Sequence, residues 1–261
     1  MRTTNASMRL PEEVFARING GVNARLLVQG SPVGVIVCHP WGPLGGSMHD
    51  PVVRTACKLF ADGGCTTARF DFRSGIGCGV SSADDVCAVA RHLLEGLPAG
   101  RRCERVLLVG YSYGSMVCLA ACAELGAGRC VGVAALAPPL DYGWALFLFR
   151  GRAVARACAR FPGPKLFVVG DRDQFCALAS LDALVTEVGP AGVTHVELRG
   201  EGADHFGIVR HVTPVLERWV REAFGVGSVA EFGRLTAWPG DDARPAAAGR
   251  ELAAEQPGRS S

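Results

Sequence analysis

The sequence predicts an α/β fold in which helices cover both faces of a mostly parallel central sheet. Two observations support this fold class. Strand-like and helix-like segments alternate through most of the chain, which is typical of parallel strands joined by helical crossovers. Several strand-like runs, such as residues 34–38 and 106–109, are short and apolar throughout, as expected for strands buried on both faces. A chain of 261 residues that is 49% hydrophobic can bury one large core of this kind.

The first third of the chain predicts an antiparallel pair followed by the first crossover unit. Residues 14–18 and 23–28 are strand-like and close in sequence, which suggests an antiparallel start. The apolar run at 34–40 is the next strand. Asp50 then offers a helix N-cap with Pro51 at the first helical position, and apolar residues at helical spacing follow until Gly63-Gly64.

The alternation continues to about residue 224. Strands are expected at 67–72, 106–109, 131–140, 165–170 and 193–200, and helices at 81–97, 116–125, 142–161, 177–188 and from about 213 to 224. The helix at 81–97 has a capping-box pattern at Ser82 and Asp85. After residue 225 the composition shifts to Gly, Pro, Ala and charge. We therefore expect one domain over residues 1–225 and a disordered or weakly attached tail over 226–261.

A Gly-x-Ser-x-Gly motif joins the predicted strand at 106–109 directly to the following helix. Gly110-Tyr111-Ser112-Tyr113-Gly114 leaves no room for a normal loop between the apolar strand and the apolar helix. Such a turn holds a serine hydroxyl above the edge of the sheet, and the two glycines allow strand and helix to approach closely. The pattern predicts that Ser112 is a nucleophile.

A serine nucleophile needs a histidine base and an acid that orients the base. In this fold they follow the serine in the order acid, then histidine. His205 lies in the loop after the last predicted strand, whereas His195 lies inside that strand and His211 lies at the final helix. His205 is thus the expected base. The candidates for the acid are, in order of preference, Asp173, Asp171 and Asp141, which all follow predicted strands.

Acyl transfer also requires N–H donors for a tetrahedral oxyanion. One expected donor is the backbone N–H of Tyr113, the residue after the serine. The other is the N–H of Trp41, the first donor after Pro40 in the glycine-rich loop that follows the strand at 34–38. For His39, which precedes the serine in the chain, a role in bracing this loop is expected.

These motifs resemble the α/β-hydrolase superfamily over roughly residues 14–224. The segments HPWGPLGGSMHDPVV, ARFDFRSGIG, LAPPLDYG and KLFVVGDRDQF are similar to those of small, lidless, predicted serine hydrolases that are described as esterases or peptidases. The resemblance implies Ser112 as nucleophile, Asp173 as acid and His205 as base. It also implies little or no cap domain.

The segment between residues 140 and 165 is long enough for one helix but not for a cap domain. Aromatic residues in this segment are candidates for lining a substrate pocket, Trp144 and Phe147 in particular. Ordinary burial in the helix core is the competing explanation for each of them. A site with little cover suits modest-sized acyl substrates better than long lipid chains.

Composition narrows the remaining function classes. The net charge is +2 and the arginines are scattered, so a nucleic-acid partner is not expected. No segment reaches the length of an apolar membrane span and the start of the chain lacks an apolar signal segment, so a cytoplasmic protein is expected. The eleven cysteines show no metal-site spacing and suggest a reducing compartment. Neither a metal nor an organic cofactor is expected.

The sequence thus predicts a serine hydrolase that cleaves a carboxylic ester or thioester of a small acyl substrate through an acyl-enzyme. Two alternatives stay open at this point. One is a peptidase or amidase of the same fold. The other is a non-catalytic scaffold of this fold that binds a partner, since fold alone does not settle function.

Overall fold

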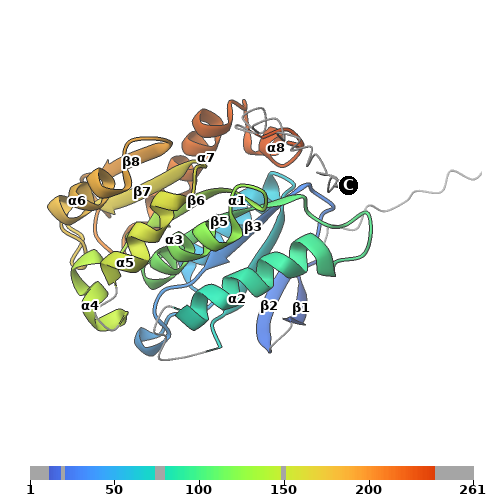
Figure 1. Cartoon of the computed structure of the whole chain (residues 1–261), viewed down its shortest axis with the longest axis horizontal. Helices are drawn as coiled ribbons and strands as arrows, with labels where there is room; N and C mark the ends of the chain where they lie inside the picture. The colour runs from blue at the N-terminus through green and yellow to red at the C-terminus, as the bar shows by residue number, and fades with distance from the viewer. Residues whose placement is uncertain (1–11, 19–20, 74–79, 148–150, 239–261) are drawn as a thin grey trace, which may run out of the picture.

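The computed structural model describes residues 12–18, 21–73, 80–147 and 151–238 (Figure 1). Its strands form a single eight-stranded sheet in the order β1-β2-β4-β3-β5-β6-β7-β8. The strands are β1 (Val14–Ile18), β2 (Val22–Leu27), β3 (Val33–Cys38), β4 (Thr66–Asp71), β5 (Arg105–Tyr111), β6 (Cys130–Leu136), β7 (Lys165–Gly170) and β8 (Val193–Leu198). β2 pairs antiparallel with both β1 and β4, and every other pair is parallel. The predicted mostly parallel sheet with an antiparallel start is confirmed.

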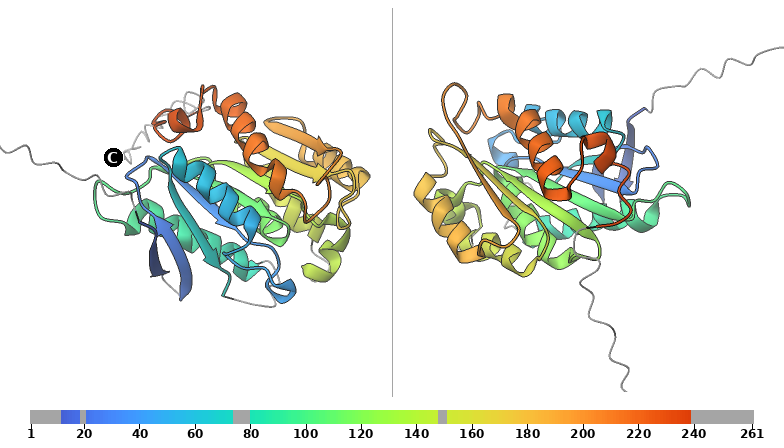
Figure 2. Two further views of the ribbon diagram at one scale, coloured as in Figure 1. Left: turned by 180° about the vertical axis from the view of Figure 1, so that it is seen from behind. Right: turned by 90° about the horizontal axis from the view of Figure 1, so that it is seen from above.

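Helices cover both faces of this sheet (Figure 2). One face carries α1 (Pro51–Asp62), α7 (Val209–Phe224) and the short α8 (Val229–Phe232), and the other carries α2 (Val80–Arg91), α3 (Tyr113–Leu125), α5 (Gly151–Arg156) and α6 (Leu178–Val188). Each face buries its own apolar cluster, because side chains of the buried strands alternate between the two faces. Among the described residues, no helix combines the length and the apolar composition needed to cross a lipid bilayer.

The start of α1 follows the prediction. Asp50 is the N-cap, with its side chain accepting a 2.8 Å hydrogen bond from the Val52 N–H, and Pro51 is the first helical residue. Val52, Val53 and Phe60 are buried on the face that meets the sheet. The capping residue therefore fixes where the loop after β3 ends, and this loop lies beside Ser112.

α2 differs from the prediction at its start. The helix already includes Val80, so Ser82 and Asp85 lie within it and do not form a capping box. Ser82 Oγ instead lies 2.8 Å from the hydroxyl of Tyr113, and the buried Asp85 accepts hydrogen bonds from the backbone and side chain of Arg73. The capping pattern was misleading because both polar side chains bond to other elements rather than to the helix end.

The segment between β6 and β7 is not the single helix that was expected. It contains a 3-10 turn (Leu140–Tyr142), α4 (Gly143–Leu146), α5 and a second 3-10 turn (Ala157–Arg160). Gly143 and Gly151 approach so closely that a Cβ on Gly151 would lie 2.6 Å from the Gly143 Cα. Two glycines in contact let α4 and α5 pack together, which a continuous helix would prevent.

The C-terminal boundary also differs from the prediction. Residues 226–238 are not a weakly attached tail, because Val229, Phe232 and Trp238 are buried in the cluster under α1 and α7. The ring of Phe232 lies 4.8 Å from that of Phe224 and 6.2 Å from that of Phe60. The domain therefore includes residue 238, and the remainder of the expected tail, residues 239–261, lies outside the described residues.

Candidate active site

Ser112 occupies the turn between β5 and α3 in a backbone conformation that non-glycine residues rarely adopt. Its φ is 53° and its ψ is −122°. Two hydrogen bonds hold this conformation: the Ser112 N–H donates to Leu136 O at 2.9 Å, and Ser115 Oγ donates to Ser112 O at 2.5 Å. Strained backbone of this kind persists only where the surroundings impose it, and it is concentrated at functional sites.

The two glycines of the motif make this turn possible. A Cβ on Gly110 would lie 2.5 Å from the Cα of Ser115, and a Cβ on Gly114 would lie 2.6 Å from the carbonyl oxygens of Cys38 and His39. Both distances are far below van der Waals contact. The strand, the helix and the end of β3 can therefore approach one another only because these positions lack a side chain.

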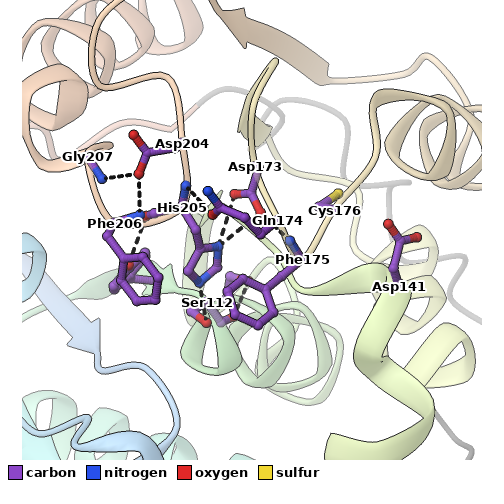
Figure 3. Close-up of polar contacts among 12 residues, drawn as sticks. Ser112, Asp141, Asp173, Gln174, Phe175, Cys176, Asp204, His205, Phe206 and Gly207 are labelled. Carbon is purple, nitrogen blue, oxygen red and sulfur yellow. Dashed lines mark hydrogen bonds and ion pairs between the residues drawn. The ribbon is translucent and has the colours of Figure 1, made fainter.

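The structure brings Ser112, His205 and Asp173 together (Figure 3). His205 Nε2 lies 2.9 Å from Ser112 Oγ, and His205 Nδ1 lies 3.1 and 3.0 Å from the two carboxylate oxygens of Asp173. Because a carboxylate only accepts, Nδ1 carries the proton and Nε2 is free to accept from the serine hydroxyl. The side chains of His205 and Asp173 are 5% and 0% exposed, so water does not compete for this contact.

Loops at the carboxyl ends of β7 and β8 position the acid and the base. The Asp173 N–H donates to Gly170 O at 3.1 Å, and its side chain accepts from the Phe175 N–H at 2.8 Å, so the turn after β7 fixes the carboxylate. The backbone carbonyl of His205 accepts a 2.9 Å hydrogen bond from the Tyr111 hydroxyl. The Phe175 ring lies 4.5 Å from the imidazole.

The other candidates for acid and base do not join this group. Asp141 accepts hydrogen bonds from Ala177 N and the Ser180 hydroxyl at the start of α6, and Figure 3 shows it apart from His205. Asp171 is exposed and lies 3.8 Å from Arg172. His195 lies on β8, within 3.7 Å of Asp182 rather than of the serine.

The loop after β3 lies beside the serine and turns back on itself. The carbonyl oxygen of Trp41 accepts from the N–H groups of Leu44 and Gly46, both at 3.1 Å. A Cβ on Gly46 would lie 2.5 Å from the carbonyl carbon of Pro40, so this position also requires glycine. Within the part of the chain that the structure describes, the backbone N–H of Trp41 donates to no protein acceptor. It is therefore available to a ligand.

His39 braces this loop, as the sequence predicted. Its Nδ1 lies 2.5 Å from Pro40 O, and its Nε2 accepts from the Phe72 N–H at 3.2 Å. This pair of bonds requires a neutral imidazole with the proton on Nδ1. Burial lowers the pKa of His39, against smaller opposing effects of Pro40 and Asp71. The neutral ring thus connects the loop to the end of β4.

A cavity of about 380 Å³ opens beside Ser112 and His205. Its walls come from the loop after β3 as far as the N-cap of α1, from the segment after β6 with α4, and from the loops after β7 and β8. The lining residues include Trp41, Tyr142, Leu146, Phe175 and Phe206. The sequence did not single out Phe175 and Phe206, although each adjoins a predicted site residue: Phe206 follows His205 directly, and Phe175 lies two residues beyond Asp173.

The two pocket residues expected from the sequence have different outcomes. Phe147 does not line the cavity: its side chain is fully buried, and its ring stacks on that of Tyr113 with centroids 4.9 Å apart. Phe147 is the C-cap residue of α4, and its ring packs in the hydrophobic core. The side chain of Trp144 lies outside the described part of the structure, although its backbone belongs to α4.

The cysteines of the described residues do not compete with Ser112 as nucleophiles. All ten of them are free thiols, and nine are buried. Burial raises the pKa of the thiols of Cys57 and Cys130 to about 12, and that of Cys176, which follows the Asp173 turn, to about 12. A thiol must ionise before it attacks, so these groups are unreactive near neutral pH.

One group of possible metal ligands lies outside the cavity. Ligand atoms of Asp182, His195 and Glu197 are within 4.8 Å of one another. Two of the three side chains are exposed, and exposed acidic groups of this kind are common without a metal. The group shares no residue with the cavity and contributes nothing to the chemistry there.

The fold of this chain is similar to those of several proteins of known structure. No protein-family model and no curated protein matches the sequence. An α/β serine hydrolase without a lid from Xanthomonas campestris matches with a TM-score of 0.62 and 26% identity, over 81% of this chain and 94% of that chain. A serine hydrolase homologue from Coxiella burnetii matches with a TM-score of 0.62 and 23% identity, over 81% and 96%.

An esterase from Pyrococcus furiosus matches with a TM-score of 0.65 and 15% identity, over 81% of this chain and 92% of that chain. At such low identity the last two likenesses concern the fold alone. All three likenesses cover nearly the whole of the related chain and most of this one. The chain therefore has the fold of the α/β-hydrolase superfamily.

Proposed function

We propose that this protein is a serine hydrolase that cleaves a carboxylic ester or thioester, with Ser112 as nucleophile, His205 as base and Asp173 as the acid that orients the base. The observation that carries the proposal is the continuous contact from Ser112 Oγ through the His205 ring to the Asp173 carboxylate. This geometry meets the requirement that an activated serine has a base within hydrogen-bond reach and that a third group orients this base.

The reaction follows from these contacts. His205 Nε2 takes the hydroxyl proton as Ser112 Oγ attacks the acyl carbonyl, and the Asp173 carboxylate stabilises the imidazolium that forms. The N–H groups of Tyr113 and Trp41 stabilise the oxyanion of the tetrahedral intermediate. Each such donor typically lowers the barrier by about 3 kcal/mol. His205 then protonates the leaving group, and a water molecule releases the acyl group by the same route.

The shape of the cavity favours small ester or thioester substrates over polypeptides. Its volume of about 380 Å³ is near the lower end of ligand sites, which span roughly 300–1,000 Å³. The walls are mostly apolar and aromatic, and the loops after β3, β7 and β8 surround the serine on several sides. A cytoplasmic location is part of the proposal, because free, buried cysteines are stable in a reducing compartment.

Hydrolysis of p-nitrophenyl esters of graded chain length tests the proposal. We expect turnover that is highest for short acyl chains. Ser112→Ala and His205→Ala should each lower kcat by a factor of about 10⁴ or more, and the double variant should be no worse than either, because the three groups act as a unit. Ser180→Ala and His211→Ala are matched controls outside the cavity and should keep wild-type turnover. A wild-type protein that unfolds cooperatively but hydrolyses no ester above the Ser112→Ala background would overturn the proposal.

A further inference from the structure

One carboxylate in the cavity has no part in the proposed reaction. Asp50 lines the same cavity as Ser112 and His205. Its side chain caps α1 by accepting from the Val52 N–H, but a cap needs only an oxygen acceptor, which Ser, Thr or Asn supplies equally well. The positive end of the helix favours a negative charge at Asp50, but the cap does not require one.

The described part of the chain provides no cation that pairs with this charge. Within the described residues Asp50 forms no ion pair, and neither lysine nor arginine lines the cavity. Burial raises the pKa of Asp50, against hydrogen bonds from Val52 and Val53 and the smaller influence of His39 and His205. A carboxylate that loses part of its hydration and has no counter-ion is costly, and a cation brought by a ligand offsets that cost.

The remaining walls also suit a positive charge. Five of the lining residues are aromatic, namely Trp41, Tyr111, Tyr142, Phe175 and Phe206. Aromatic faces attract cations, most strongly where water is excluded. Asp50, Asp173 and Asp204 all raise the pKa of the Tyr111 phenol, after burial, which is the largest cause. Asp50 and two carboxylates behind the cavity wall thus lie close enough to act on the phenol of Tyr111, which lines the cavity.

We propose that the cavity selects esters that carry a quaternary or protonated amine a few atoms from the scissile carbonyl, with Asp50 and the aromatic rings holding the cation. This inference rests on the proposed ester hydrolase function and adds the chemical class of the substrate. It also implies that esters with a carboxylate or phosphate near the reacting carbonyl are poor substrates, because the cavity repels them.

Pairs of esters with the same shape and different charge test the inference. Acetylcholine and 3,3-dimethylbutyl acetate place the cation or its neutral isostere on the alcohol side. The p-nitrophenyl esters of 4-(trimethylammonio)butanoate and 5,5-dimethylhexanoate do so on the acyl side. We expect kcat/KM to favour the cation in at least one pair by about tenfold, as a charge pair shielded from water would give.

Asp50→Asn keeps an oxygen that can cap α1 and removes the charge, so the preference for the cation should fall towards one. Asp62→Asn removes a carboxylate from the exposed end of the same helix and should leave the preference unchanged. Asp50→Ser also keeps a side-chain oxygen that can cap α1. It replaces Asp50→Asn in this test if the Asn variant folds poorly. Inhibition of the wild type tests the inference without any substitution. Choline should inhibit at about tenfold lower concentration than 3,3-dimethylbutan-1-ol.

The outcomes separate the two proposals. Equal kcat/KM within both pairs in an active wild type overturns the inference and leaves ester hydrolysis standing. A preference for the cation that Asp50→Asn leaves intact overturns the role of Asp50. A wild type that hydrolyses neither member of either pair, nor any neutral p-nitrophenyl ester, overturns the proposed function and the inference with it.

Discussion

At the scale of single residues, the site depends on backbone conformations, tautomers and side-chain positions that the fold fixes and that an unfolded chain would not hold. Ser112 has a positive φ, and His39 has a single tautomer fixed by two backbone partners. His205 is fixed at three points, since its carbonyl bonds to Tyr111 and its two ring nitrogens face Asp173 and Ser112. These constraints remove the need for reorganisation when a substrate arrives.

Asp173→Asn tests the orientation of the histidine. The amide would donate to His205 Nδ1 and thereby place the proton on Nε2, which could then no longer accept from Ser112. We expect kcat for a p-nitrophenyl ester to fall by a factor of about 10³–10⁴ with little change in stability. Asp171→Asn, two residues away on the same loop and exposed, should stay within about twofold of the wild type. Equal losses in both variants would contradict the assignment of Asp173.

His39 predicts how stability depends on pH. Burial lowers its pKa from the usual 6.5, so on acidification the unfolded chain binds a proton before the native state does. The free energy of unfolding should therefore fall as the pH drops below about 6.5, with the loss continuing down to the native pKa.

Urea unfolding at several pH values between about 7 and 5.5 measures this slope. His39→Gln, which can keep an acceptor for the Phe72 N–H, should show a smaller slope than the wild type. Burial also lowers the pKa of His92, so the double variant with His92→Gln should be flatter still. The same slope in His39→Gln and wild type would show that this ring does not resist protonation.

At the scale of elements, close contacts between backbones build the site. β5 and α3 meet at Ser112, and the end of β3 lies against the first turn of α3 at Gly114. The position of the glycine-rich loop relative to the serine follows from this contact. The turn at Ser112 thus depends on three elements, β3, β5 and α3, and not on local sequence alone.

Gly114→Ala tests this junction. The added Cβ would lie 2.6 Å from the carbonyl oxygens of Cys38 and His39, so the end of β3 must move. We expect a loss of about 2 kcal/mol in the free energy of unfolding, as in overpacked cores, together with a loss of the proposed hydrolase activity. Gly128→Ala meets no atom within 4 Å and should change stability by less than about 0.5 kcal/mol. Similar unfolding curves for the two variants would contradict the proposed packing.

The elements that the sequence predicted well are those whose signals are local. The strands and α1 follow from apolar runs and from the Asp50-Pro51 cap, and the structure has them within a few residues. The segment between β6 and β7 was misjudged because its break depends on Gly143 meeting Gly151, a contact eight residues apart that helical periodicity does not reveal. The start of α2 was misjudged because Ser82 bonds to Tyr113, on another helix.

At the scale of the whole molecule, the sequence order of the candidate residues is enough to predict that they meet. Because β5, β7 and β8 are parallel, their carboxyl ends share one edge, and the loops there bring Ser112, Asp173 and His205 together. The walls of the cavity could not be predicted in the same way. Asp50 and Phe206 reach it from loops after different strands, and Phe147, which lies between them in the chain, is taken into the core instead.

The extent of the domain gives a prediction at this scale. Phe232 of α8 is fully buried against Phe60 and Phe224, so residues beyond 225 contribute to the core. Phe232→Ala should lower the free energy of unfolding by about 3–5 kcal/mol. Arg234→Ala, two residues on and exposed, should change it by less than about 0.5 kcal/mol. Wild-type stability of Phe232→Ala in chemical denaturation would restore the boundary at residue 225.

The most direct measurement is the residue that a fluorophosphonate probe modifies, read by mass spectrometry after trypsin digestion. Cleavage after Arg105 and Arg129 leaves Ser112 and Ser115 on one peptide, and fragmentation distinguishes the two serines. We expect a single adduct on Ser112 that is absent from Ser112→Ala and strongly reduced in His205→Ala. An adduct on any other residue, or no adduct on a protein that unfolds cooperatively, would contradict it.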